Sequence, residues 1–194
     1  MSTEVEGILR ESGALLDGHF LLTSGMHSSQ YMEKFHILQY PWHTERLCRL
    51  IAEHFRDQRI QTVAGPTVGG VILAYEVGRQ LGVRGIFAEQ SASNREFRRG
   101  FTLAPGERVL VVDDVLTTGG SVVQMLDAVR RHGAVVAGLG ILVDRSGGKA
   151  DLDVPYFACH RMDLPTYAPA ECPLCAKGVP LRALGGSQSS SAKV

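Results

Sequence analysis

The segment Arg108–Ser121 reads RVLVVDDVLTTGGS and decides the fold class. Its apolar run, Val109–Val112, is typical of a strand that is buried on both faces of a parallel sheet. Asp113 and Asp114 stand at the carboxyl end of this strand, and the turn Thr117–Ser121 then opens a helix. In open parallel sheets, ligands bind beyond the carboxyl ends of the strands. The segment therefore predicts a ligand site at this edge of the sheet.

The chain on either side of this segment alternates between strand-like apolar runs and helix-like patterns. This alternation predicts an α/β fold with a central, mostly parallel sheet of about five strands flanked by helices. A candidate strand also falls at 30–37, after a turn at 23–25. The expected strands are 61–64, 83–87, 109–112, 135–143 and 155–158, and the expected helices are 2–12, 41–56, 69–81 and 120–132.

Length and composition indicate one globular domain. We expect the 194 residues to form a single domain over 1–184, with a small hood from about 1–40. The last ten residues, 185–194, are GGSQSSSAKV, which predicts a disordered tail. Lys plus Arg and Asp plus Glu each total 20, so the formal net charge is zero. Proteins that bind nucleic acid through its phosphates usually carry a basic excess, so we expect a small-molecule ligand.

Other features of the chain predict a cytoplasmic protein. No stretch approaches the roughly 18 apolar residues that cross a bilayer. Residues 1–7 lack the basic and apolar segments of a secretory signal, and four cysteines do not suggest a disulfide framework.

The turn Thr117–Ser121 has the groups that bind a phosphate. Its glycines allow close approach of the backbone, and the helix start and three hydroxyls supply hydrogen-bond donors. Asp113 and Asp114 would repel a phosphate in direct contact, so ribose hydroxyls or Mg²⁺ must lie between these carboxylates and the phosphate. Dinucleotide and Gly-Lys-Ser/Thr phosphate-loop motifs are missing from the sequence. The alternative is an ordinary strand–helix turn in which Thr117 or Thr118 caps the helix.

Residues 109–121 resemble the phosphoribosyl pyrophosphate loop of the type I phosphoribosyltransferases. The resemblance implies that the two acids hold the ribose hydroxyls and hold Mg²⁺ mainly through the substrate. It also implies that the turn binds the 5′-phosphate. These residues are Asp113, Asp114, Thr117, Thr118, Gly119, Gly120 and Ser121.

Three further segments extend the resemblance. Residues 18–31 are similar to the N-terminal hood of orotate phosphoribosyltransferases, and residues 65–70 resemble the family's pyrophosphate loop. Arg145, after the strand 135–143, matches the position from which orotate enzymes present an arginine to the base; arginine suits a planar carboxylate. The alternative for Arg145 is a surface ion pair with Asp144 or Asp151. The substrate-binding residues implied here are Thr23, Tyr31, Pro66, Thr67, Val68, Gly69 and Arg145.

The sequence also departs from the orotate enzymes. Glu89-Gln90 stands where they usually carry Arg-Lys, Thr23 replaces a lysine of the hood, and the expected mobile loop 91–100 has no lysine. Departing pyrophosphate still needs positive charge. We therefore expect the arginines of that loop to be catalytic, with Mg²⁺ sharing the charge; the alternative is that Arg98-Arg99 only solvates the loop edge. The arginines are Arg95, Arg98 and Arg99.

Cys172 and Cys175 have the spacing of half a zinc site. Cys159 and His160, or a dimer partner, are the candidates to complete it. Because structural zinc needs four ligands, the sequence favours two thiols without metal. The histidines His19, His27 and His36 are interpreted as packing or hydrogen-bonding residues.

The resemblance implies an enzyme that transfers phosphoribose from phosphoribosyl pyrophosphate to orotate. The products would be orotidine 5′-monophosphate and pyrophosphate, a step of UMP biosynthesis. It also implies a homodimer in which the loop of one subunit reaches the other. Two alternatives remain: an enzyme for another purine or pyrimidine base, and a regulator that senses phosphoribosyl pyrophosphate without catalysis.

Overall fold

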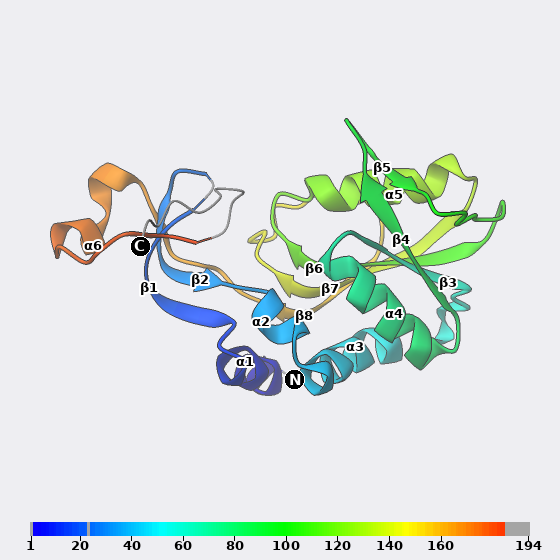
Figure 1. The fold of residues 1–194 in the computed structure, drawn as a ribbon, viewed down its shortest axis with the longest axis horizontal. Helices are drawn as coiled ribbons and strands as arrows, with labels where there is room; N and C mark the ends of the chain where they lie inside the picture. The colour runs from blue at the N-terminus through cyan, green and yellow to red at the C-terminus, as the bar shows by residue number, and fades with distance from the viewer. Residues whose placement is uncertain (1, 23, 185–194) are drawn as a thin grey trace, which may run out of the picture.

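A computed structural model describes residues 2–22 and 24–184. The described chain forms two sheets that lie side by side as two lobes (Figure 1). Thr23 and the expected disordered tail lie outside the described residues.

The larger sheet has six strands in the order β5-β4-β3-β6-β7-β8. Five of them are parallel, and β5 runs antiparallel to β4 at one edge. The predicted mostly parallel sheet is therefore confirmed, with β5 added. The strands are β3 (Thr62–Pro66), β4 (Arg84–Gln90), β5 (Arg95–Phe97), β6 (Arg108–Leu116), β7 (Val135–Asp144) and β8 (Tyr156–Arg161).

Helices cover both faces of this sheet (Figure 1). On one face α1 (Ser2–Glu11), α3 (Pro41–Phe55) and α4 (Gly69–Leu81) pack in a core that includes Leu110 and Val112 of β6. On the other face α5 (Gly120–Arg131) packs in a core that includes Val109 and Val111. The apolar run of β6 is thus buried on both faces, as its sequence predicts. A short 3₁₀ turn, η1 (Arg56–Gln58), follows α3.

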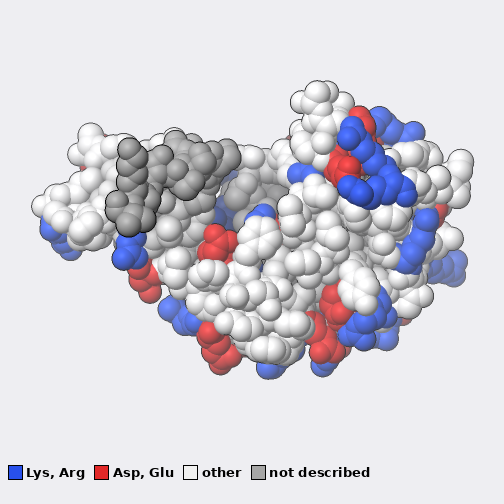
Figure 2. Space-filling view, in the orientation of Figure 1, with Lys and Arg blue, Asp and Glu red and all other residues white. Residues whose placement is uncertain are grey.

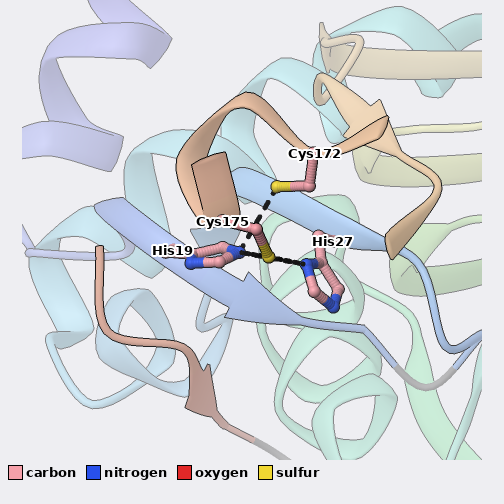
Figure 3. Close-up of side chains that lie close together, drawn as sticks. All are labelled: His19, His27, Cys172 and Cys175. Atoms are coloured by element: carbon pink, nitrogen blue, oxygen red, sulfur yellow. Dashed lines mark hydrogen bonds between the residues drawn. The ribbon is translucent and has the colours of Figure 1, made fainter. Parts of the chain in front are cut away.

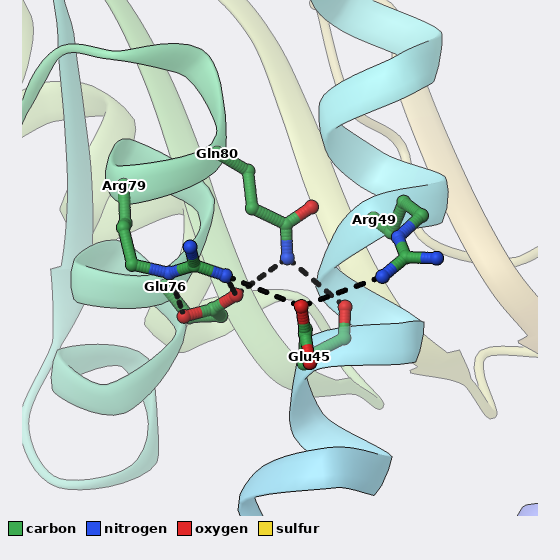
Figure 4. Close-up of polar contacts among 5 residues, drawn as sticks. All are labelled: Glu45, Arg49, Glu76, Arg79 and Gln80. Atoms are coloured by element: carbon green, nitrogen blue, oxygen red, sulfur yellow. Dashed lines mark hydrogen bonds and ion pairs between the residues drawn. The ribbon is translucent and has the colours of Figure 1, made fainter.

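A polar cluster on the surface links α3 to α4 (Figure 4). Arg79 Nη2 lies 2.7 Å from Glu76 Oε1 in its own helix and 3.4 Å from Glu45 Oε1 of α3. Gln80 donates to the Glu45 carbonyl at 3.0 Å. The hydrogen bond from Arg79 lowers the pKa of Glu76. Exposed ion pairs of this kind contribute about 0.2–1 kcal/mol each, so the cluster fixes helix position more than overall stability.

The hood is a four-stranded sheet in the order β10-β1-β2-β9. Its central strands are β1 (Leu15–Leu21) and β2 (His27–Met32), and its edges are β9 (Thr166–Tyr167) and β10 (Arg182–Ala183). The N-terminal residues therefore do not build the hood alone, because a C-terminal segment supplies both edges. Between these edges lie η2 (Pro169–Glu171) and α6 (Pro173–Ala176).

The candidate strand at 30–37 is wrong in its bounds. The strand β2 ends at Met32, and α2 (Phe35–Leu38) follows. Ile37 and Leu38 are the apolar residues that suggested a longer strand. They lie in α2 and are buried there.

Charged side chains of both signs lie next to one another over α4 and near β5 on the face in Figure 2. This mixed pattern agrees with the zero formal net charge. None of the described helices combines the length and the apolar character needed to cross a membrane.

Candidate active site

Two helices begin at the ends of neighbouring strands. The strands β3 and β6 are adjacent, and they lead into α4 and α5 respectively. The cap residues, Val68 of α4 and Gly119 of α5, make no side-chain cap hydrogen bond. The alternative in which Thr117 or Thr118 caps α5 is therefore not what the structure shows. Both helix starts leave N–H groups free for an anion.

The loop between β3 and α4 packs tightly against the rest of the site. A side chain at Gly65 would overlap the backbone of Gly70, and one at Gly69 would overlap Asp114 Oδ2. The Thr67–Val68 peptide bond is cis. The glycines of this loop thus allow its backbone to lie directly beside the acidic pair.

Asp113 and Asp114 lie within β6, which continues to Leu116, and both are buried. The Asp114 N–H donates to Asp113 Oδ1 at 2.8 Å. Burial, together with the charge of Asp114, raises the pKa of Asp113 to about 7. Asp113 is therefore only partly ionised near neutral pH, and a ligand or cation that stabilises its ionised form would lower its pKa.

Lys34 is the site residue that sequence reasoning missed. Its Nζ donates to Asp114 Oδ1 at 2.9 Å and lies 2.9 Å from Oδ2. The two residues are 80 positions apart, and no local pattern around Lys34 predicts that contact. A lysine three residues before the buried Ile37 is typical of surface charge, so only the folded chain reveals this ion pair.

Arg95 is the loop arginine that the structure brings to the site. Its guanidinium donates to the Thr67 carbonyl at 3.3 Å and to Ser121 Oγ at 3.2 Å, so it bridges the two expected ligand loops. The backbone of Arg95 is held in turn by Arg131 of α5, which donates to its carbonyl at 2.6 Å. Part of the expected mobile loop 91–100 is thus the ordered strand β5.

The other two loop arginines are turned toward acidic partners. Arg98 lies 2.9 Å from Glu96, and Arg99 lies 2.6 Å from Glu89. The structure does not bring them to the site, and their catalytic role stays a prediction.

Arg145 lies at the end of β7, beside two adjoining cavities of about 380 and 300 Å³. Both cavities are also lined by Tyr31 and Thr117. Arg145 Nε is buried and has no hydrogen-bond partner among the described residues, and burial lowers the pKa of this guanidinium. An anionic ligand in the cavity would therefore be stabilised there.

The expected alternative for Arg145, an ion pair with Asp144 or Asp151, is absent from the described part of the chain. Asp144 instead accepts a hydrogen bond from Tyr156 Oη at 3.1 Å and lies 3.5 Å from Arg161 Nε.

The cavity can also accommodate the expected Mg²⁺. Asp113 and Asp114 offer carboxylate oxygen ligands, which this ion prefers. Lys34 already neutralises part of that charge, which suits an ion held mainly through substrate oxygens.

The prediction for the cysteine pair is wrong in the residues that lie beside it. Cys159 is buried, and its thiol donates to the Leu47 carbonyl at 3.4 Å. The side chains that meet Cys172 and Cys175 are His19 and His27 of the hood. Cys159 and His160 therefore do not complete the group, because they lie in β8, a strand of the larger sheet.

Comparison with known proteins agrees with this geometry. Residues 37–167 match the family described as phosphoribosyl transferase domain, so the chain belongs to that family. The predicted resemblance to type I phosphoribosyltransferases and the predicted fold class are confirmed.

Several relatives share one named activity within this family. The orotate phosphoribosyltransferase of Chlorobaculum parvum is 49% identical over 97% of this chain and 98% of its own length. That of Pelotomaculum thermopropionicum is 50% identical over 91% of this chain and 93% of its own length. The crystal structure of the orotate phosphoribosyltransferase from Aeropyrum pernix superimposes with a TM-score of 0.69 at 27% identity, covering 81% of this chain and 93% of that one.

Proposed function

We propose that this chain is an orotate phosphoribosyltransferase, which forms orotidine 5′-monophosphate and pyrophosphate from orotate and phosphoribosyl pyrophosphate. The reaction is a step of UMP biosynthesis. The observation that carries the proposal is the buried Nε of Arg145, which has no hydrogen-bond partner among the described residues and lies beside a cavity shared with Thr117. Relatives about half identical over nearly the whole chain carry the same activity in their names.

The phosphoribosyl end of the substrate fits the edge formed by β3 and β6. Thr117–Ser121 and the start of α5 bind the 5′-phosphate through backbone N–H groups and hydroxyls. Asp113 and Asp114 hold the ribose hydroxyls and orient the sugar. Pro66–Gly69 and the start of α4 bind the pyrophosphate, on the neighbouring strand end.

Bond breaking at the anomeric carbon moves negative charge onto the pyrophosphate. Arg95 is placed to stabilise that charge, because it already contacts both loops. When bound, Mg²⁺ neutralises further phosphate charge. As the carbon becomes cationic, the ring nitrogen of orotate bonds to it, the N–H proton of that nitrogen is released to the pyrophosphate or to solvent, and the pyrophosphate leaves.

The base end of the cavity selects the acceptor. Arg145 pairs with the orotate carboxylate, and Tyr31 lies beside it in the cavity wall. Uracil lacks the carboxylate and would leave Arg145 buried without a partner, which costs several kilocalories per mole. Thr23, which falls outside the described residues, belongs to the same proposal by resemblance alone.

A panel of bases tests the assignment. Purified protein with phosphoribosyl pyrophosphate and Mg²⁺ is offered orotate, uracil and adenine, and nucleotide products are separated by chromatography. Of the three bases, we expect only orotate to give a nucleotide product. Product from adenine or uracil instead would favour the other-base alternative. Binding of phosphoribosyl pyrophosphate with no product from any base would favour the alternative of a regulator that senses this ligand without catalysis.

We also infer that the enzyme is a cytoplasmic homodimer, as the resemblance implies. Large apolar side chains stand exposed around the starts of α3 and α4, as a subunit interface would require. They are Phe35, Trp42, Val68, Ile72 and Tyr75. Light scattering on the eluted protein should give twice the chain mass of 21.0 kDa. A mass equal to that of one chain would contradict the dimer.

A further inference from the structure

Four side chains with metal-binding atoms converge in the hood (Figure 3), and none of them lines the two cavities beside Arg145. His19 comes from β1, His27 from β2, and Cys172 and Cys175 from the start of α6. One nitrogen or sulfur atom from each lies within 4.8 Å of the other three. Cys172 and Cys175 are only three residues apart, but they meet two histidines from the other end of the chain.

The distances in this group are close to those of a tetrahedral site. His19 Nε2 lies 3.0 Å from His27 Nδ1 and 3.4 Å from Cys172 Sγ. Cys175 Sγ lies 3.7 Å from His19 Nε2 and 3.3 Å from His27 Nδ1. Zinc with bonds of about 2.0 Å to nitrogen and 2.3 Å to sulfur separates its tetrahedral ligands by about 3.3–3.8 Å. Small side-chain shifts would therefore bring all four atoms onto one ion.

The surroundings of His19 prepare it for this role. Its other ring nitrogen, Nδ1, lies 2.8 Å from the Val179 carbonyl, which can only accept a hydrogen bond. The proton of a neutral imidazole is therefore on Nδ1, and the lone pair of Nε2 points into the group. Backbone carbonyls orient metal-bound histidines in the same way.

Burial also favours a metal over free polar groups. His19, His27 and Cys172 are buried, and only Cys175 is exposed. A hydrogen-bonded cluster without metal is the competing state, since thiols and imidazoles can satisfy one another at these distances.

We propose that His19, His27, Cys172 and Cys175 bind one structural Zn²⁺ as two imidazoles and two thiolates. Each thiol gives up its proton on binding, so one zinc ion displaces two protons and the ligand set leaves a net charge of zero. Four protein ligands fill the tetrahedron, which leaves no open position for substrate or water. The site is therefore structural, and it is independent of the proposed transferase activity.

The position of the site indicates what it stabilises. The C-terminal segment that contains α6 pairs with β1 through β10, and β1 pairs with β2. Tyr31, which lines the cavity, lies near the far end of β2 from His27. A zinc ion would tie the C-terminal segment to these two strands at their other end. It would hold the hood as a rigid wall of the cavity, since the short strands β9 and β10 alone give few ladder hydrogen bonds.

Metal content of the full-length protein tests the proposal directly. Untagged protein is purified without chelator from zinc-supplemented medium and analysed by plasma mass spectrometry. We expect about one zinc per chain in the wild type and in Cys159→Ala, the matched control with a buried cysteine outside the group. Cys172→Ser and His19→Asn should each lose most of the zinc.

Cobalt substitution keeps the test valid if those variants fold poorly. Wild-type protein reconstituted with Co²⁺ should show the intense visible bands of a tetrahedral thiolate site, and chelation of zinc should lower the melting temperature. Wild-type protein without zinc that also binds no added Zn²⁺ would overturn the proposal. A Cys172–Cys175 disulfide, or iron in place of zinc, would overturn it as well.

Discussion

Arg145 keeps one buried polar atom, Nε, without a hydrogen-bond partner in the described chain, and it lies beside a cavity that Asp114 also lines. An unpaired buried polar group costs about 1–3 kcal/mol, and more when it is charged. A ligand that supplies the partners recovers that cost. The Nε atom of Arg145 therefore marks the part of the cavity where an anionic group would bind.

Replacement of Arg145 should reduce the use of orotate more than the binding of phosphoribosyl pyrophosphate. We expect Arg145→Ala to lower kcat/KM for orotate roughly 100-fold or more, because a charge-assisted pair in a buried site contributes about 2–5 kcal/mol. Arg161→Ala is the matched control, since Arg161 is exposed and pairs with Asp144 at the neighbouring strand end. Steady-state assays with each substrate varied check this; equal losses in both variants would contradict the assignment.

The raised pKa of Asp113 makes the stability of the protein depend on pH. Unfolded, this carboxyl ionises near its ordinary value of 3.8, whereas the folded state keeps the proton to about 7. The unfolded state thus releases its proton first, and the free energy of unfolding falls as pH rises from about 4 to 7. Asp113→Asn cannot ionise and should remove roughly 2–4 kcal/mol of that decline.

Urea unfolding of both proteins at pH 5 and pH 8 measures this difference. The amide retains the oxygen that accepts from the Asp114 N–H, so the fold should survive. The same pH dependence in both proteins would show that Asp113 ionises normally in the folded state.

At the scale of elements, the site depends on two helices that start beside each other. It also depends on glycines that let the backbone of the loop before α4 lie close to Asp114. The loop before α4 tests this through two glycines with different neighbours. At Gly69 a methyl group would meet the end of the Asp114 side chain, which can move, whereas at Gly65 it would meet backbone that cannot.

We therefore expect Gly69→Ala to fold but to lose most of its activity, because Asp114 is displaced from its place beside Lys34. Gly65→Ala should lose stability as well, by roughly 1–3 kcal/mol for an overpacked core. Circular dichroism melts alongside activity assays separate the two effects. An active Gly69→Ala enzyme would show that the position of Asp114 does not matter.

Three arginines lie in β5 or directly after it, in different settings, which allows a matched comparison. Arg95→Ala should lower kcat by about 10- to 100-fold, because Arg95 alone of the three bridges Thr67 and Ser121. Arg98→Ala changes an arginine three residues away that pairs with Glu96. Single-turnover rates with saturating substrates measure the step. A larger effect at Arg98 than at Arg95 would mean that the hairpin rearranges when substrate binds.

For the whole molecule, the sequence predicts the larger lobe well and the hood poorly. Long apolar runs reveal β6 and β7, and closing glycines mark the ends of α4 and α5, with positive φ of 70° at Gly82 and 72° at Gly133. The strands β9 and β10 have two residues each and exist only because β1 and β2 accept them, so no local pattern predicts them.

The same distinction applies to the candidate site. Residues on one continuous segment, such as Asp113 and Asp114, were recognisable because their spacing carries the chemistry. The contact of Lys34 with Asp114 and the meeting of His19 with Cys172 join segments far apart in the chain. The sequence also could not separate Arg95 from Arg98, since their positions differ only after β5 pairs with β4.

Loss of orotate absorbance in the presence of phosphoribosyl pyrophosphate and Mg²⁺ measures the proposed transferase activity directly. We expect the wild-type protein to consume orotate only when both are present, and Asp113→Asn/Asp114→Asn to lose at least 100-fold in turnover while it stays folded. Near wild-type turnover in the double variant would contradict the role of the two acids, and no turnover in the wild type would contradict the proposed activity.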